Sequence, residues 1–204
     1  MTTYPLAFPS VGIRTSTFRL NASTAANISP FTGQEQVYFY GGQWWEGQVT
    51  FKPSTREEIA EVQAFMAKLK GRFGTFLYGD PDALAKGFMG AGGTILVDGG
   101  SQTGNTLSVD GMTVSETIAK AGDYFQLGTG TGARLYMFTE DLVSDGSGAG
   151  TATFEPNLRV SPSDNDQLDI TAPVGAFRLA ENAAEWGSNF SSVYDVTISF
   201  REAL

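Results

Sequence analysis

The chain has 204 residues and a formal net charge of −9; 41% of its residues are hydrophobic and 25 are glycine. It contains neither histidine nor cysteine, which excludes a Ser-His-Asp triad, a Cys-His pair, disulfide bonds and the usual nitrogen and sulfur ligands of zinc. The N-terminus lacks the features of a signal peptide, and no segment approaches the roughly 20 apolar residues of a membrane span. We therefore expect a soluble protein, without a membrane anchor, that is assembled inside a cell.

The negative charge is concentrated in the middle of the chain. From Asp80 to Ala172 there are thirteen acidic and four basic residues, whereas the rest of the chain has nine of each sign. The middle therefore carries the whole excess and is expected to be a separate module. An acidic surface of this kind repels nucleic-acid backbones and anionic membranes.

The first forty residues predict strands separated by polar or proline-limited segments. Pro5 and Pro9 restrict regular pairing near the start of the chain. Gly41-Gly42 predicts a tight turn between two strands. The expected elements are an extended arm over 1–11, a strand over 12–21, a Ser/Thr/Asn-rich loop over 22–33, and a strand over 36–40 that turns at Gly41-Gly42 into a strand over 44–52.

The stretch 44–78 predicts a strand, a helix and a second strand. Apolar and polar residues alternate over 45–51, which is the period of a half-buried strand. Two overlapping capping boxes are possible at the start of the helix, Ser54 with Glu57 and Thr55 with Glu58, and Gly71 can take the left-handed turn that ends it. The helix is expected over 55–70, with an apolar stripe of Ile59, Val62, Phe65, Met66 and Leu69.

The middle of the chain changes to brief strands cut by glycine, which predicts a small β-barrel or meander. At the C-terminal end, apolar and polar residues alternate cleanly over 192–201. A well-patterned last strand after an acidic middle indicates that the outer parts form one sheet system. The expected organisation is a β framework of residues 1–81 and 167–204 with one helix, and an inserted acidic, glycine-rich β domain of residues 82–166.

No motif in the sequence fixes a catalytic site. The most enzyme-like acid is Glu46 beside two tryptophans, but its place on the polar side of a strand favours an ordinary exposed acid. Residues 164–166 resemble part of a calcium loop, yet the required Gly and Glu are missing, which favours a turn. We expect no catalytic, cofactor-binding or metal-binding residues and no enzymatic activity. Two carboxylate pairs of the kind used by glycosidases are present without a motif to select them, Glu140 with Asp141 and Glu181 with Glu185.

The aromatic residues around the predicted hairpin allow two interpretations. Trp44 and Trp45 could stack on sugars, which would make the chain a carbohydrate-binding module or a receptor-binding component. The interpretation we favour is that a neighbouring subunit covers the outward-facing rings, because exposed apolar patches on strands mark interfaces. The residues predicted to form this subunit interface are Tyr38, Tyr40, Trp44 and Trp45.

Several segments together resemble tail-tip proteins of long-tailed bacteriophages, of the distal tail protein type. The resemblance spans almost the whole chain and rests on turn and packing signatures rather than on catalytic residues. The segments that carry it are 29–32, 37–45, 49–53, 69–81, 121–128, 156–159 and 174–179.

The resemblance implies a structural subunit of the virion. Such proteins form a ring, usually hexameric, that joins the tail tube to the hub and fibres and lets the genome pass without specific DNA binding. It also implies a tube-like domain, a β-sandwich or split barrel with one flanking helix, together with host attachment and assembly in the bacterial cytoplasm. The insert does not match the carbohydrate-binding lobe of some relatives. No cofactor and no catalytic residue carries over.

Overall fold

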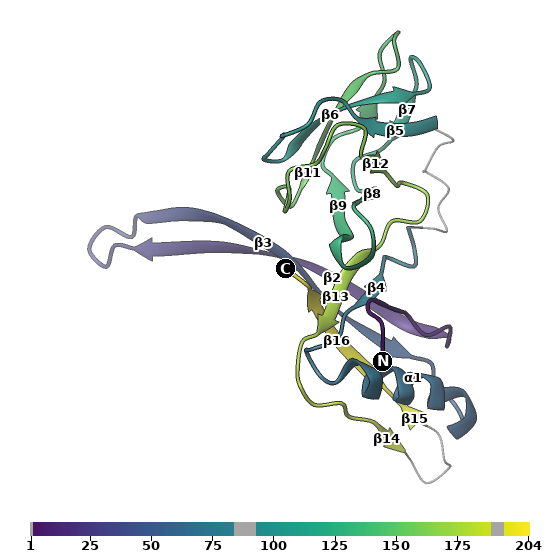
Figure 1. The fold of residues 1–204 in the computed structure, drawn as a ribbon. Coiled ribbons are helices and arrows are strands. Elements are labelled where there is room, and N and C mark those ends of the chain that lie inside the picture. The colour runs from purple at the N-terminus through teal and green to yellow at the C-terminus, as the bar shows by residue number, and fades with distance from the viewer. Residues whose placement is uncertain (1, 84–92, 189–193) are drawn as a thin grey trace.

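The computed structural model describes residues 2–83, 93–188 and 194–204 (Figure 1). The fold is mainly β, with one α-helix in the described residues, as the sequence predicts. Its strands form two six-stranded sheets and two small two-stranded sheets. A long two-stranded arm projects from the side of the molecule, and the second large sheet stands above the first in the view of Figure 1.

The first large sheet, here called the framework sheet, is built from both outer parts of the chain. Its strands, in spatial order, are β1 (Leu6–Ala7), β4 (Phe76–Tyr78), β13 (Gly175–Leu179), β16 (Thr197–Glu202), β3 (Glu35–Phe51) and β2 (Ile13–Ile28). The strands β14 (Gly187–Ser188) and β15 (Tyr194–Asp195) form a separate two-stranded sheet and lie between β13 and β16 in the sequence. The first part of the predicted strand 192–201, residues 192 and 193, lies outside the described residues.

Helix α1 (Arg56–Leu69) packs against the framework sheet with the predicted stripe. The Thr55 amide donates to Glu58 Oε2 at 2.9 Å, which forms the expected capping box. The helix ends at Leu69; its C-cap Lys70 is left-handed with φ of 53°, and Gly71 is left-handed as predicted, with φ of 67°. The five stripe residues are all buried in one core with the inward residues of the sheet: Ile59, Val62, Phe65, Met66 and Leu69.

The N-terminal hairpin differs from its prediction. The strand β2 continues through the expected loop to Ile28, and β3 begins at Glu35, so the turn lies over 29–34. Gly41-Gly42 is instead an interior point of β3, where the register with β2 shifts. Gly41 has a φ of +77°, a conformation suited to glycine, and it accommodates a β-bulge that twists the ribbon.

The second large sheet, here called the insert sheet, closes almost completely on itself. Its two outer strands are joined by a pair of backbone hydrogen bonds between Gln126 and Asp169, of 2.8 and 3.0 Å. The strands, in order, are β12 (Gln167–Leu168), β5 (Gly93–Val97), β6 (Thr106–Met112), β11 (Gly150–Glu155), β9 (Arg134–Phe138) and β8 (Tyr124–Leu127). The strand β12, which the sequence analysis placed in the framework, therefore pairs within the insert.

The insert sheet encloses a second core that is separate from the framework core. Phe125, Phe138 and Phe154 are fully buried there; the Phe125 ring packs against Phe138 in a tilted arrangement with centroids 4.7 Å apart and against Phe154 edge to face at 5.1 Å. The remaining short elements are β7 (Thr117–Ala119) paired with β10 (Leu142–Val143), and the 3-10 turn η1 (Gly130–Gly132). The insert thus has its own closed sheet and its own apolar interior.

Candidate functional site

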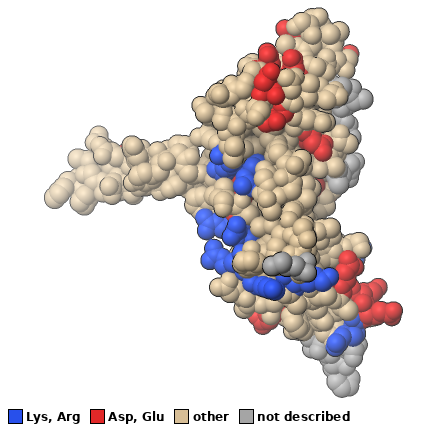
Figure 2. All heavy atoms as spheres, viewed as in Figure 1, with Lys and Arg blue, Asp and Glu red and all other residues tan. Residues whose placement is uncertain are grey.

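The outer halves of β2 and β3 form an arm that has no core of its own. Over residues 20–44 the sequence contains a single charged residue, Glu35, and Figure 2 shows the arm almost without acidic or basic atoms. Its large apolar side chains are exposed: Ile28 67%, Phe31 95%, Val37 65%, Tyr38 64%, Phe39 50% and Tyr40 63%. A two-stranded ribbon is marginally stable alone in water, and a patch of this kind marks a contact surface.

Apolar side chains occupy both faces of the arm. Neighbouring residues of a strand point to opposite faces, so Tyr38 and Tyr40 share one face while Val37 and Phe39 share the other. The two tyrosine rings contact each other edge to face with centroids 4.9 Å apart. Because neither face is covered within the described chain, the arm can insert between two surfaces of a partner rather than lie flat on one.

The tip of the arm is an ordered turn that presents one aromatic ring. The Ser29 amide donates to the Gln34 carbonyl at 2.8 Å, and the Gly33 amide donates to the Ser29 carbonyl at 2.9 Å. Phe31 lies in this turn and is 95% exposed. The turn therefore holds a free aromatic side chain at the most distant point of the arm.

Where the arm leaves the framework, a buried ion pair joins the insert to the framework. Arg159 of the insert contacts Glu202 at the end of β16, with Nε to Oε1 at 3.0 Å and Nη2 to Oε2 at 2.8 Å. Arg159 also donates to the Gln43 carbonyl, and Glu202 Oε2 accepts from the Trp45 amide at 3.1 Å. Side-chain exposure is 15% for Arg159 and 3% for Glu202. This pair ties the insert to the framework where the arm emerges.

Trp45 belongs to the same joint, so the prediction that it lies at a subunit interface is wrong. Its indole is 3% exposed, and Nε1 donates to the Leu135 carbonyl of the insert at 2.9 Å. Trp45 lies on the inward face of β3 with Val49 and Phe51. A sugar-stacking platform built from Trp44 and Trp45 together is therefore not available in this fold.

Trp44 is half-buried and Tyr38 and Tyr40 are exposed, so these three predicted interface residues remain accessible in different degrees. The Trp44 indole donates to Glu46 Oε1 at 2.8 Å, and the Arg201 guanidinium lies 5.0 Å from the ring centroid of Trp44. Trp44 thus holds polar groups at the arm root, while the two tyrosines are the residues that a partner would cover.

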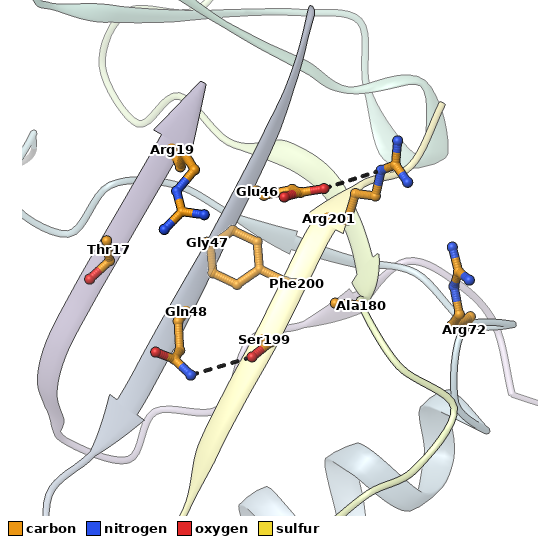
Figure 3. A pocket seen from close by; sticks show the side chains of 10 residues that line it. All are labelled: Thr17, Arg19, Glu46, Gly47, Gln48, Arg72, Ala180, Ser199, Phe200 and Arg201. Carbon is orange, nitrogen blue, oxygen red and sulfur yellow. Dashed lines mark hydrogen bonds and ion pairs between the residues drawn. The ribbon is translucent and has the colours of Figure 1, made fainter. Parts of the chain in front are cut away.

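A row of charged side chains crosses the outer face of the framework sheet. Arg178 on β13 lies opposite Arg201 on β16, Arg201 lies opposite Glu46 on β3, and Glu46 lies opposite Arg19 on β2. Arg72, which follows α1, lines a cavity of about 440 Å³ together with Arg19 and Arg201 (Figure 3). We call Arg19, Arg72, Arg178 and Arg201 the arginine row.

The acidic residues singled out in the sequence hold turns of the backbone. Asp164 Oδ1 accepts from the Gly99 amide at 2.8 Å, and Asp166 Oδ2 accepts from the Ser163 amide at 2.8 Å. The four residues of the proposed carboxylate pairs are exposed, at 140–141 and at 181 and 185. Within residues 2–83, 93–188 and 194–204, no group of three or more acidic side chains is arranged to hold a metal ion.

Burial changes the acidity of three tyrosines at the framework and insert cores. Loss of solvent raises the pKa of Tyr136, whose hydroxyl oxygen accepts from the Arg159 amide at 3.1 Å. Burial also raises the pKa of Tyr78 and of Tyr124, and the nearby Asp80 charge adds to both effects. These groups are neutral near pH 7 and serve packing and hydrogen bonding.

The sequence analysis missed the joint between Arg159 and Glu202, although one signal for it was present. The last strand places Val196, Ile198 and Phe200 on its inward face, and continuing that alternation by two residues reaches Glu202. A charged residue at an inward position requires a partner of opposite charge. The identity of that partner depends on the fold, because Arg159 is 43 residues away in the chain.

No family model matches the chain, and no curated protein matches it. In the part of the chain that the structure describes, no helix has both the length and the apolar character needed to cross a membrane.

Proposed function

We propose that this protein is a structural subunit of a bacteriophage tail tip. In this role it assembles with copies of itself into a ring, hexameric by resemblance, that joins the tail tube to the hub and fibres. The genome passes through the ring without being bound specifically, and the protein resides in the virion after assembly in the host cytoplasm. The role requires contact surfaces and no reactive side chains.

The observation that carries the proposal is the uncharged arm. Six large apolar side chains are exposed on it, on both of its faces and at its tip. A chain that functions alone would gain from polar residues at these positions, because exposed apolar ribbons associate. An arm that is docked against a neighbouring subunit explains both its length and its composition.

The framework sheet supports the same role. It is a six-stranded sheet with one packed helix, and a β-rich domain with one flanking helix is what the resemblance implies for the tube-like domain. The segments that carry the resemblance include the tip of the arm at 29–32 and its returning strand at 37–45. The resemblance and the exposed surface thus coincide in one part of the chain.

The test is the particle mass of the purified protein, measured by mass photometry and by imaging. We expect ring-shaped particles of several copies for the unmodified chain. The variant Phe31→Ser/Tyr38→Ser should assemble at least about tenfold more weakly, because it removes apolar area from the contact. A matched control is Phe73→Ser, since Phe73 is 73% exposed but lies outside the arm. A 21.8 kDa monomer at every concentration would contradict the proposal.

A further inference from the structure

The arginine row places like charges side by side. Arg178 and Arg201 are directly opposite partners on β13 and β16, so their side chains project from the same face at a spacing of about 5 Å between Cβ atoms. Like charges in such a pair are destabilising. Two adjacent guanidinium groups are, however, a favourable arrangement for an anion, because each can bind a carboxylate through two hydrogen bonds.

The carboxylate already present in the row does not neutralise it. Glu46 accepts hydrogen bonds from the Asn21 amide group at 2.7 Å and from the Trp44 indole at 2.8 Å, and it lies 3.6 Å from Arg201 Nε. Against this one acid stand four arginines. Of these, Arg19, Arg72 and Arg178 have no acidic partner among the described residues. The face therefore carries an unmatched positive charge.

The next row of the same face consists of hydrogen-bonding groups without charge. Ser199 on β16 lies opposite Gln48 on β3, and Gln48 lies opposite Thr17 on β2. All three line the cavity with the arginines (Figure 3). Hydroxyl and amide groups next to guanidinium groups can donate to the remaining oxygens of a bound carboxylate. The face is thus suited to a carboxylate-rich protein surface.

The insert is a surface of that kind in the same molecule. The segment from Asp80 to Ala172 carries all of the excess negative charge. Figure 2 shows basic groups gathered over the framework near the foot of the arm, and acidic groups on the insert and at the far end of the framework near α1. The ion pairs within the described residues are Arg159–Glu202 and Arg201–Glu46, so the insert does not pair with the arginine row of its own chain.

We infer that the arginine row docks against the acidic insert of a neighbouring copy. The inference rests on the proposed function and adds to it the surface and the direction of the contact. Because the two surfaces are different, the contact is head to tail, which is the kind of interface that closes into a ring. The charge pairing sets the register between copies, and the arm supplies the apolar contact.

Nucleic acid fits the face less well than a second copy does. Phosphates also bind arginine, but the chain has a net charge of −9 and its insert repels a polyanion that approaches the framework. A neighbouring copy, by contrast, brings acidic groups of its insert to the unpaired arginines when it docks. Binding of DNA by the arginine row would therefore overturn the inference.

The test uses Arg178→Glu in the full chain, with assembly followed by mass photometry at about 50 mM and about 500 mM NaCl. The substitution places a glutamate opposite Arg201, so the fold can gain an ion pair while the face loses most of its net positive charge. We expect a melting temperature that is unchanged or higher, together with at least tenfold weaker assembly at low salt. The matched control is Lys68→Glu, at an exposed position of helix α1. It has the same change in charge and should assemble normally.

Complementary reversal on the insert sharpens the test. Asp98 and Glu140 are exposed at two different turns of the insert, and Asp98→Lys/Glu140→Lys should weaken assembly alone and restore it when combined with Arg178→Glu. Assembly by Arg178→Glu equal to that of the unmodified chain would overturn the inference while leaving the ring intact. The inference would also be overturned if Arg178→Glu assembled normally but no longer bound a duplex DNA that the unmodified chain binds. An unmodified chain that never assembles would instead contradict the proposed function.

Discussion

The insert sheet and the framework sheet have the same number of strands but differ at their edges. The insert joins its outer strands through Gln126 and Asp169 and encloses an apolar core of its own. The framework extends β2 and β3 far beyond its core and exposes apolar side chains on them. The difference indicates that the insert is complete as a folded unit, and under the proposed function the exposed arm of the framework is where another copy would dock.

The largest expected effect is a contrast between two phenylalanine substitutions. Phe154→Ala opens a cavity in the closed insert, where Phe154 is fully buried, and should lower the free energy of unfolding by about 3–5 kcal/mol. Phe39→Ala on the arm should change the stability of the monomer by less than about 0.5 kcal/mol. Urea denaturation measures both values. A cost for Phe39→Ala similar to that for Phe154→Ala would mean that the arm is part of the core.

The joint between the two sheets gives the next largest effect. Glu202→Ala leaves the largely buried Arg159 side chain without its ion-pair partner. It should therefore lower the free energy of unfolding by about 3 kcal/mol or more. The double variant Arg159→Met/Glu202→Leu should recover most of this loss, because a buried ion pair and an apolar pair of similar volume are often equivalent. A double variant as unstable as Glu202→Ala would show that the hydrogen bonds to Gln43 and Trp45 matter more than the charge pair.

A smaller effect is expected at high pH. Burial raises the pKa of Tyr136, Tyr78 and Tyr124 above the usual 10.0, so the unfolded chain ionises before the folded one does. The stability contributed by these groups is complete below pH 10 and is lost as the pH rises above 10 through the folded-state values. Thermal melting across this range should show the decline, and Tyr136→Phe should reduce it. Stability that rises above pH 10 would contradict the burial of these rings.

The parts of the fold that sequence reasoning reached are those set by local periodicity. The helix stripe from Ile59 to Leu69 and the alternation of Val196, Ile198 and Phe200 describe single elements, and each predicts its own buried face. The same alternation placed Trp45 with Val49 and Phe51, which is where the structure has it. Its assignment to a subunit interface failed because the aromatic cluster was interpreted without regard to that register.

The parts that sequence reasoning missed depend on pairing between distant segments. Residues 22–27 are small or polar, so nothing local marks them as a strand; their ladder with residues 36–43 defines it. Gly41-Gly42 has the composition of a turn, yet the same left-handed glycine conformation also suits a bulge. The arginine row arises only from the register across four strands, because Arg19, Arg178 and Arg201 belong to separate elements.

The most direct test of the docked arm uses the absence of cysteine in the chain. Phe31→Cys places a single thiol at the tip of the arm, and its rate of reaction with a maleimide can be measured in the monomer and in the assembled particle. We expect the rate to fall at least about tenfold on assembly, because the tip becomes buried against a neighbour. Phe73→Cys, away from the arm, should react equally fast in both states. A Phe31→Cys thiol that reacts as fast in the particle as in the monomer would contradict the account.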